Sequence, residues 1–227
     1  MKMSRQSEQI LEEQLLIQLQ KLGYQYVSIA DEKDLLANLQ VQLEKHNQAA
    51  LAKTGNSKFS KTEFERVLNL LNKGSVFEKS KTLRQKQHII RDAPEGAATG
   101  ENLYFEFLNT EHWCQNQYQV THQVSQAGTY KNRYDVTILI NGMPLVQIEL
   151  KRKGLELKEA FNQINRYQRH SFGANTALFQ YVQIFIISNG VNTKYYSNNR
   201  QQSFKQTFYW TDINNKRLSN ILNGFTD

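Results

Sequence analysis

Leucines spaced three and four residues apart predict two helices near the start of the chain. The first helix is expected over about 8–22, where Gly23 supplies a C-terminal stop. The second is expected over about 33–48, after a short extended segment at 24–29 and before a polar loop around Gly55. The leucines that define the two apolar stripes are Leu11, Leu15, Leu19, Leu22, Leu35, Leu36, Leu39 and Leu43.

A local capping signal predicts a third helix. Ser60 and Glu63 have the spacing of a capping box, in which the hydroxyl and the carboxylate each satisfy a free backbone amide. Apolar residues at helical spacing follow, and Gly74 marks the expected end of this helix. The basic stretch over 79–88 predicts no particular element, and 94–100 is expected to be a loop.

Beyond Leu103 the apolar period changes towards two, which predicts one strand after another up to Leu150. A helix over about 157–170 and a β-prone strand over 181–188 follow. This order of elements predicts an α/β or α+β fold with a mixed central sheet flanked by helices. Because the chain has only two prolines and eleven glycines, long linkers are not expected, and residues 1–227 are predicted to form a single domain.

Two alternating runs on either side of Asn141-Gly142 predict a β-hairpin. A plain two-residue turn would place Asp135 opposite Ile148 and would put the apolar residues of the two strands on opposite faces. A shift of one residue aligns Val136 with Ile148 and places Asp135 across from Glu149. Because a one-residue slip turns every side chain to the other face, we expect the apolar pattern to prevail, through a three-residue loop or a bulge.

In this register Asp135, Glu149 and Lys151 lie on the face opposite the apolar residues, away from the core. Two carboxylates on one face repel each other unless a cation neutralises them. A hard divalent cation such as Mg²⁺ would do so, and it can lower the pKa of a bound water. Lys151 could orient that water or help to deprotonate it. By itself, however, an Asp followed by Glu-x-Lys is more often a set of solvated charges on a surface strand.

The wider sequence RYDVTILINGMPLVQIELKRK, from Arg133 to Lys153, resembles the core of the PD-(D/E)xK nucleases. It is most similar to the R subunits of type I restriction enzymes, with Tyr134 in place of the motif's nominal proline. Gln163 and Tyr167 resemble the Gln-x-x-x-Tyr signature of the same branch. The resemblance covers roughly residues 7–200 and is densest over 133–190.

This resemblance implies a restriction-endonuclease-like core in which Asp135, Glu149 and Lys151 are catalytic and Asp135 and Glu149 bind Mg²⁺. It also implies that Gln163 and Tyr167, which share a helix face, lie beside the site and help to position it or the DNA. We therefore expect this pair to border the site and not to form part of the core. From residue chemistry alone, the tyrosine would more often be a packed helix aromatic and the glutamine a solvated surface residue.

The family also places an acidic residue on the first helix, and Glu12 and Glu13 compete for that role. At 100° per residue, Glu12 falls within the apolar stripe and Glu13 falls outside it. A carboxylate that faces inward needs a reason, and a nearby metal site would supply one. We therefore choose Glu12 as a supporting residue.

Basic residues outnumber acidic residues by 28 to 21, a net charge of +7, which weakly favours a polyanionic partner. A group of basic side chains follows the proposed site in sequence and could contact DNA phosphates. These residues are Arg152, Lys153, Lys158, Arg166 and Arg169.

Several classes of function are excluded or disfavoured. No Gly-x-x-x-x-Gly-Lys-Ser/Thr sequence occurs, so the chain cannot hold ATP as a P-loop does. The five histidines are too scattered to predict a zinc site. The longest apolar stretch, 181–187, is too short to cross a bilayer. Cys114 is the only cysteine, so no intrachain disulfide exists, and a reducing, cytoplasmic location is the default expectation.

The resemblance implies a Mg²⁺-dependent DNA endonuclease domain that hydrolyses phosphodiester bonds non-specifically, at sites distant from the recognition sequence. Because R subunits of this family are longer and carry an ATP-driven translocase, we expect the chain to be an N-terminal fragment of one. The implied partners are double-stranded DNA and the methylation and specificity subunits. Two alternatives stay open: a catalytically silent nuclease-like DNA-binding or subunit-docking module, and a basic protein-interaction domain without a role on DNA.

Overall fold

The computed structural model describes residues 8–126, 132–170, 178–199, 202–218 and 220–225. A seven-stranded mixed sheet forms its centre, in the order β1-β4-β5-β6-β7-β8-β9. Strands β1 and β4, and strands β6 and β7, run parallel, and the other neighbours are antiparallel. The strands are β1 (Gln25–Tyr26), β4 (Tyr118–Gln126), β5 (Asn132–Ile140), β6 (Met143–Leu150), β7 (Ile184–Ser188), β8 (Thr193–Ser197) and β9 (Phe208–Tyr209).

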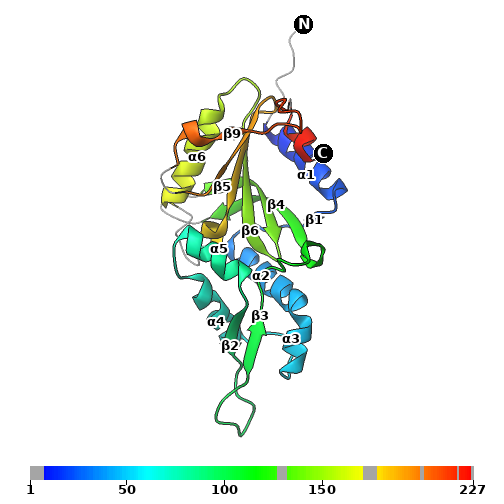
Figure 1. Cartoon of the computed structure of the whole chain (residues 1–227), viewed down its shortest axis with the longest axis vertical. Helices are drawn as coiled ribbons and strands as arrows, with labels where there is room; N and C mark the ends of the chain where they lie inside the picture. The colour runs from blue at the N-terminus through cyan, green and yellow to red at the C-terminus, as the bar shows by residue number, and fades with distance from the viewer. Residues whose placement is uncertain (1–7, 127–131, 171–177, 200–201, 219, 226–227) are drawn as a thin grey trace.

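Two helices flank this sheet from opposite sides, as Figure 1 shows: α1 (Glu8–Lys21) and α6 (Leu157–His170). The remaining helices and a two-stranded sheet of β2 (Gln87–Ile90) and β3 (Asn102–Phe105) gather at one end of the central sheet. These helices are α2 (Glu32–His46), α3 (Gln48–Lys53), α4 (Lys61–Leu71) and α5 (Val76–Arg84). Short 3-10 turns lie at η1 (Trp113–Gln115), η2 (Leu178–Tyr181), η3 (Phe204–Gln206) and η4 (Ile221–Phe225). The sequence-based prediction of a mixed sheet flanked by helices is therefore confirmed.

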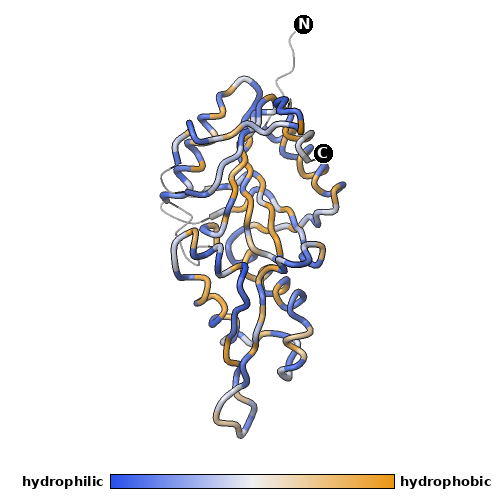
Figure 2. Tube along the Cα trace, in the orientation of Figure 1, coloured by the Kyte–Doolittle hydropathy of each residue, from blue (hydrophilic) through white to orange (hydrophobic). Residues whose placement is uncertain are grey.

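Both faces of the central sheet are buried. Its strands are accordingly rich in hydrophobic residues, as Figure 2 shows. Val136, Ile138 and Ile148 pack against α1 on one face. Leu139 belongs to a larger core that includes α6 on the other face. Glu149 is fully buried as well. The expectation that the face carrying Glu149 and Lys151 lies away from the core is therefore wrong, because α6 covers it.

The predicted helices exist, with two additions. The capping box at Ser60 is confirmed: Glu63 N–H donates to Ser60 Oγ (3.1 Å), and Ser60 N–H donates to Glu63 Oε2 (2.9 Å). Helix α3 occupies residues expected to begin a loop, and α5 and β2 occupy the stretch for which no element was predicted. Helix α5 also begins with a capping box, at Ser75 and Glu78, so a sequence signal for it was present. The strand expected over 181–188 is shorter, because 178–181 forms η2.

The hairpin of β5 and β6 combines the two competing registers. Asn141 (φ 49°) and Gly142 (φ 81°) form the two-residue turn, with positive φ at both positions. The register then shifts between Ile138 and Leu139, with Leu145 as the additional residue of β6. Beyond this bulge, Ile138 pairs with Val146 and Val136 with Ile148, as the apolar pattern predicted. The bulge therefore keeps the preferred turn and also keeps the apolar residues on their common face.

Gly142 tests how far the hairpin depends on its turn. A Cβ at this position would lie 2.7 Å from Leu39 Cα in α2, and its φ of +81° disfavours any other residue. We expect Gly142→Ala to destabilise the protein by roughly 2–4 kcal/mol, combining left-handed strain with overpacking against backbone. Urea denaturation measures this change. Gly55→Ala is the matched control, because Gly55 has a φ of +96° and open space around it; an equal loss in both variants would contradict the role of the α2 contact.

Candidate active site

Asp135, Glu149 and Lys151 meet where β5 and β6 separate. Asp135 Oδ2 accepts a hydrogen bond from the Leu150 amide (2.8 Å), which fixes the carboxylate across the two strands. The Lys151 amide donates to the Ser188 carbonyl (2.8 Å), which holds the end of β6 against β7. The pairing of β5 with β6 ends at Val136 and Ile148. Asp135 and Glu149, the next residues beyond that pair, interact electrostatically with each other and with Lys151. The predicted convergence of the three side chains is therefore observed.

Glu149 and Lys151 form a buried ion pair. Glu149 Oε1 accepts a hydrogen bond from Lys151 Nζ (2.9 Å), and the same ammonium donates to the Leu150 carbonyl (3.0 Å). Glu149 is 0% exposed and Lys151 is 8% exposed. Among the described residues, Glu149 Oε2 has no hydrogen-bond partner although it is buried. One carboxylate oxygen is thus held by the lysine, and the other is left without a proton donor.

The site concentrates negative charge in a poorly solvated place. Burial, together with the neighbouring Asp135, raises the pKa of Glu149 well above its ordinary value. Burial also raises the pKa of Asp135, although the Leu150 amide opposes this effect. Burial alone would lower the pKa of Lys151, but Glu149, Asp135 and Glu8 outweigh it and raise that pKa. The ammonium is therefore firmly charged, while each carboxylate pays a desolvation penalty for its charge.

These residues fit a hard divalent cation. Asp135 and Glu149 offer carboxylate oxygens, which Mg²⁺ prefers, and the buried Glu149 Oε2 has no hydrogen-bond partner in the described part of the chain. Within the part of the chain that the structure describes, no group of three or more His, Cys, Asp or Glu side chains is arranged to hold a metal. A cation at Asp135 and Glu149 would therefore complete its shell with water, backbone or phosphate oxygens, as Mg²⁺ commonly does.

Helix α1 contributes Glu12, which faces inward as its position in the apolar stripe predicted. Glu12 is 7% exposed, whereas Glu13 is exposed. The Glu12 carboxylate contacts His122 Nδ1 (2.9 Å) and accepts a hydrogen bond from Gln123 Nε2 (2.5 Å). Burial raises the pKa of Glu12, and the charge of Asp135 adds to this effect. The orientation of Glu12 is confirmed, and its part in catalysis stays a prediction.

Gln163 and Tyr167 lie together on α6. Gln163 Nε2 donates to the Tyr167 hydroxyl, which donates in turn to the Arg133 carbonyl (3.1 Å). The Tyr167 ring packs edge-on against Tyr134, with 4.8 Å between centroids, and it is 4% exposed. Burial raises the pKa of Tyr167, with a further contribution from Glu149. The pair does border the site, but the expectation that it lies outside the core is wrong for Tyr167.

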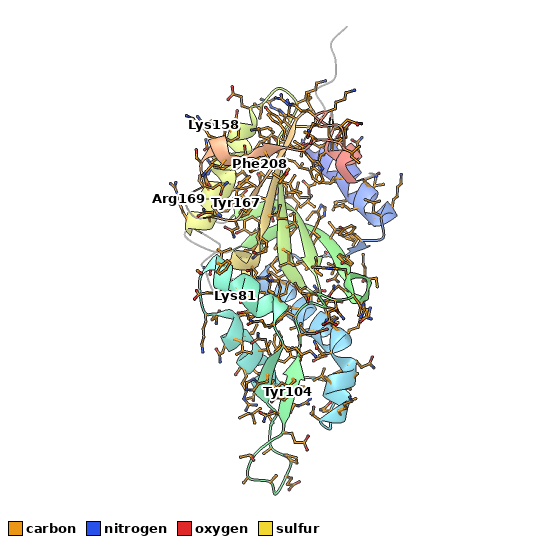
Figure 3. All side chains as sticks on the ribbon, in the orientation of Figure 1. Lys81, Tyr104, Lys158, Tyr167, Arg169 and Phe208 are labelled. Carbon is orange, nitrogen blue, oxygen red and sulfur yellow. The ribbon has the colours of Figure 1, made fainter. Side chains whose placement is uncertain are left out.

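The five basic residues proposed to contact DNA do not form one cluster. Arg152 lines a cavity of about 610 Å³ together with Asp135 and Glu12. Lys153 and Lys158 line a second cavity, of about 530 Å³, beside β8. Arg166 and Arg169 are exposed on α6, and Figure 3 shows Lys158 and Arg169 on the outer side of this helix. The five residues are therefore divided between the Asp135 cavity, the second cavity and the exposed side of α6.

The first cavity also contains residues that the sequence did not single out. Glu8, His122, Gln123 and Arg133 line it together with Asp135. Glu8 accepts a hydrogen bond from the Arg152 amide (3.1 Å). Glu8 lies one helical turn before Glu12, so the same stripe could have identified it. The position of Gln123 depends on a positive φ (55°) within β4, for which the sequence holds no signal.

A mixed sheet flanked by helices, with an aspartate on one strand of a hairpin and Glu-x-Lys on the next, is consistent with a PD-(D/E)xK-like fold. The family described as "Type I restriction enzyme R protein N terminus" matches residues 5–204. The chain belongs to this family.

Several relatives align over nearly the whole chain. It is 45% identical over 226 residues to the endonuclease subunit of the type I restriction enzyme SauCOLORF180P from Staphylococcus aureus (strain COL). It is 46% identical over 223 residues to that of SsaAORF53P from Staphylococcus saprophyticus. These two alignments cover 99% and 98% of the chain, respectively, and 23% of the length of each relative. An Escherichia coli relative, the EcoprrI endonuclease subunit, is 38% identical over 225 residues, covering 96% of the chain and 68% of that protein.

The raised pKa of Asp135 predicts that this carboxylate reduces stability in the absence of metal. A carboxyl group whose pKa is raised by folding lowers the stability of the fold as pH rises through that pKa. Asn keeps an oxygen acceptor for the Leu150 amide but carries no charge. In a chelating buffer at neutral pH, we therefore expect Asp135→Asn to increase the free energy of unfolding. The melting temperature should rise by about 2–4 °C for each kcal/mol of that increase. The gain should shrink below about pH 4, where an ordinary carboxyl group is protonated. A lower melting temperature at pH 7 would show that the charged Asp135 stabilises the fold, contrary to its desolvation.

Tyr167 allows packing and positioning to be separated. Tyr167→Ala removes a buried ring, and we expect it to cost roughly 3–5 kcal/mol of stability. Tyr167→Phe keeps the ring and removes only the hydroxyl that joins Gln163 to the Arg133 carbonyl, so its stability cost should be about 1 kcal/mol. Thermal denaturation measures both changes. Equal losses in the two variants would show that the hydroxyl, and not the ring, provides the stabilisation.

Proposed function

We propose that this chain is the Mg²⁺-dependent nuclease domain of a type I restriction endonuclease subunit and that it hydrolyses phosphodiester bonds of double-stranded DNA. The observation that carries this proposal is the fully buried Glu149 beside the Asp135 carboxylate and the Lys151 ammonium. Its Oε2 has no hydrogen-bond partner among the residues that the structure describes. The names of the relatives, all endonuclease subunits of type I restriction enzymes, support the same reaction.

Each residue would have a distinct task. Asp135 and Glu149 would hold Mg²⁺, which when bound lowers the pKa of a coordinated water and stabilises charge on the phosphate. Lys151 uses two of its three N–H donors on Glu149 and the Leu150 carbonyl, so one is left for a water or a phosphate oxygen. The pairing with Glu149 keeps this ammonium positive, as stabilisation of phosphate charge requires. Asp135 is oriented by the Leu150 amide before any ligand arrives.

Basic residues at several places could contact the DNA phosphates. Arg152 lines the cavity of Asp135, Lys153 and Lys158 line the second cavity, and Arg166 and Arg169 are exposed on α6. Such contacts bind phosphates without reading bases, which supports cleavage that is not sequence-specific. Choice of the target would then belong to the methylation and specificity subunits of the restriction complex. None of the described helices combines the length and the apolar character that a membrane-spanning helix requires.

The chain spans about a quarter of the length of the staphylococcal relatives, so we propose the ATP-dependent activity for the complete restriction complex. In that complex, Asp135→Ala, Glu149→Ala and Lys151→Ala should each reduce DNA cleavage below about 1% of the unsubstituted rate, because each removes charge stabilisation from the transition state. ATP hydrolysis should be unchanged, and it serves as the control for folding and assembly. Plasmid cleavage and phosphate release measure the two activities.

Metal binding gives an independent readout on the chain alone. Mg²⁺ or Mn²⁺ should raise its melting temperature, and Asp135→Asn and Glu149→Gln should abolish that increase. Near-normal cleavage in either alanine variant of a carboxylate would overturn the proposed function. Intact metal binding and DNA binding without cleavage in the complex would favour a catalytically silent module instead.

A further inference from the structure

His122 occupies the cavity of the proposed active site, although nothing in the sequence groups it with the other site residues. It lies on β4, next to β5, and pairs with Val136, the residue after Asp135. Its side chain is 33% exposed and lines the 610 Å³ cavity with Asp135 and Arg152. The edge of its ring packs against Tyr26, with 5.7 Å between centroids. His122 is therefore within the space that a DNA strand approaching Asp135 would enter.

The surrounding residues fix the orientation of this imidazole. His122 Nδ1 lies 2.9 Å from Glu12 Oε1, and the second oxygen of Glu12 accepts a hydrogen bond from Gln123. The Glu12 carboxyl group occupies the Nδ1 side of the ring, so this contact fixes the direction in which the other ring nitrogen points. Nε2 is then the ring nitrogen available on the cavity side. The consecutive residues His122 and Gln123 of β4 thus both contact the buried carboxylate of Glu12 in α1.

The backbone at Gln123 is what allows this arrangement. Its φ of 55° lies in the left-handed region, which residues other than glycine seldom adopt. On either side of it the strand changes face: Val120 belongs to the core under α1, whereas Val124 belongs to the core that includes α6. Positive φ in a strand next to a cleft is expected where a side chain must be redirected. Here it lets His122 and Gln123 both reach Glu12.

We propose that His122 contacts the DNA directly, with Nε2–H donating to a phosphate oxygen of the strand bound in the cavity. Glu12 and Gln123 are then positioning residues that hold the ring. Arg133 and Arg152, which line the same cavity, supply further positive charge to that strand, while Glu8, Glu13 and Asp135 supply negative charge. This inference rests on the proposed function, because it takes DNA as the ligand of this cavity.

Two isosteric variants separate contact with DNA from a structural tie to Glu12. His122→Gln places an amide near the position of Nε2, whereas His122→Asn places one near Nδ1. A phosphate contact at Nε2 predicts that Gln keeps most of the affinity for a short duplex and that Asn and Ala lower it about tenfold, as for a charged hydrogen bond. His112→Ala is the control, because His112 is an exposed histidine that does not line the cavity. Binding by fluorescence anisotropy in Ca²⁺ measures affinity without relying on cleavage.

NMR of the chain with isotope-labelled histidines reports directly on the His122 ring. On addition of the duplex in Ca²⁺, the His122 ring signals, assigned with the His122→Gln variant, should shift, and those of His112 should not. Rescue by Asn and not by Gln, or an unshifted His122 ring in a chain that binds the duplex, would overturn the inference. Failure of the proposed function would be seen separately, as cleavage that persists in Asp135→Ala.

Discussion

The ion pair between Glu149 and Lys151 is the interaction on which the arrangement of the site depends. Glu149 has no solvent exposure, and an isolated carboxylate at such a position would be protonated or would destabilise the fold. Lys151 neutralises one of its oxygens from two residues away on the same strand. Because residues two apart in a strand point to the same side, the Glu-x-Lys spacing is sufficient to form the pair. Its burial comes from the elements packed around the end of β6, and the unpartnered second oxygen is the part of the site that a cation would complete.

Along β4 and β5, the side chains change from one face of the sheet to the other near the Glu149–Lys151 ion pair. Val136 packs under α1, whereas Tyr134, two residues earlier, belongs to the core that includes α6. Asp135 lies at this change and binds the Leu150 amide through its side chain. In a regular strand, the Asp135 side chain would point to only one face of the sheet. The irregular one lets it interact with Glu149 and also line the cavity with Glu12.

The sequence predicted what depends on local pattern. Helix α6 has the expected bounds, and the shifted register of the hairpin follows from the alternation of apolar residues around Val136 and Ile148. The sequence could not predict burial of Glu149, because that burial depends on how segments outside the hairpin, including α6, pack against its strand. The tie between Glu12 and His122 joins residues 110 positions apart and requires the positive φ of Gln123, so scattered histidines offered no sign of it. Tyr134 in place of a proline is explained by its packing against Tyr167.

The Asp135 cavity is lined by acidic as well as basic side chains, and the exposed Glu13 stands among them with Arg133 and Arg152. Glu149 is buried and Asp135 half-buried, and the desolvation of both raises their affinity for a proton or for a metal that replaces it. Arg133 and Arg152 line the same cavity but are exposed, where guanidinium groups keep their charge at little desolvation cost. Under the proposed function, a phosphodiester held by Arg133 and Arg152 would be repelled by the Asp135 carboxylate unless a cation lay between them. Under the proposed function, we therefore expect cation binding to precede or accompany DNA binding near Asp135.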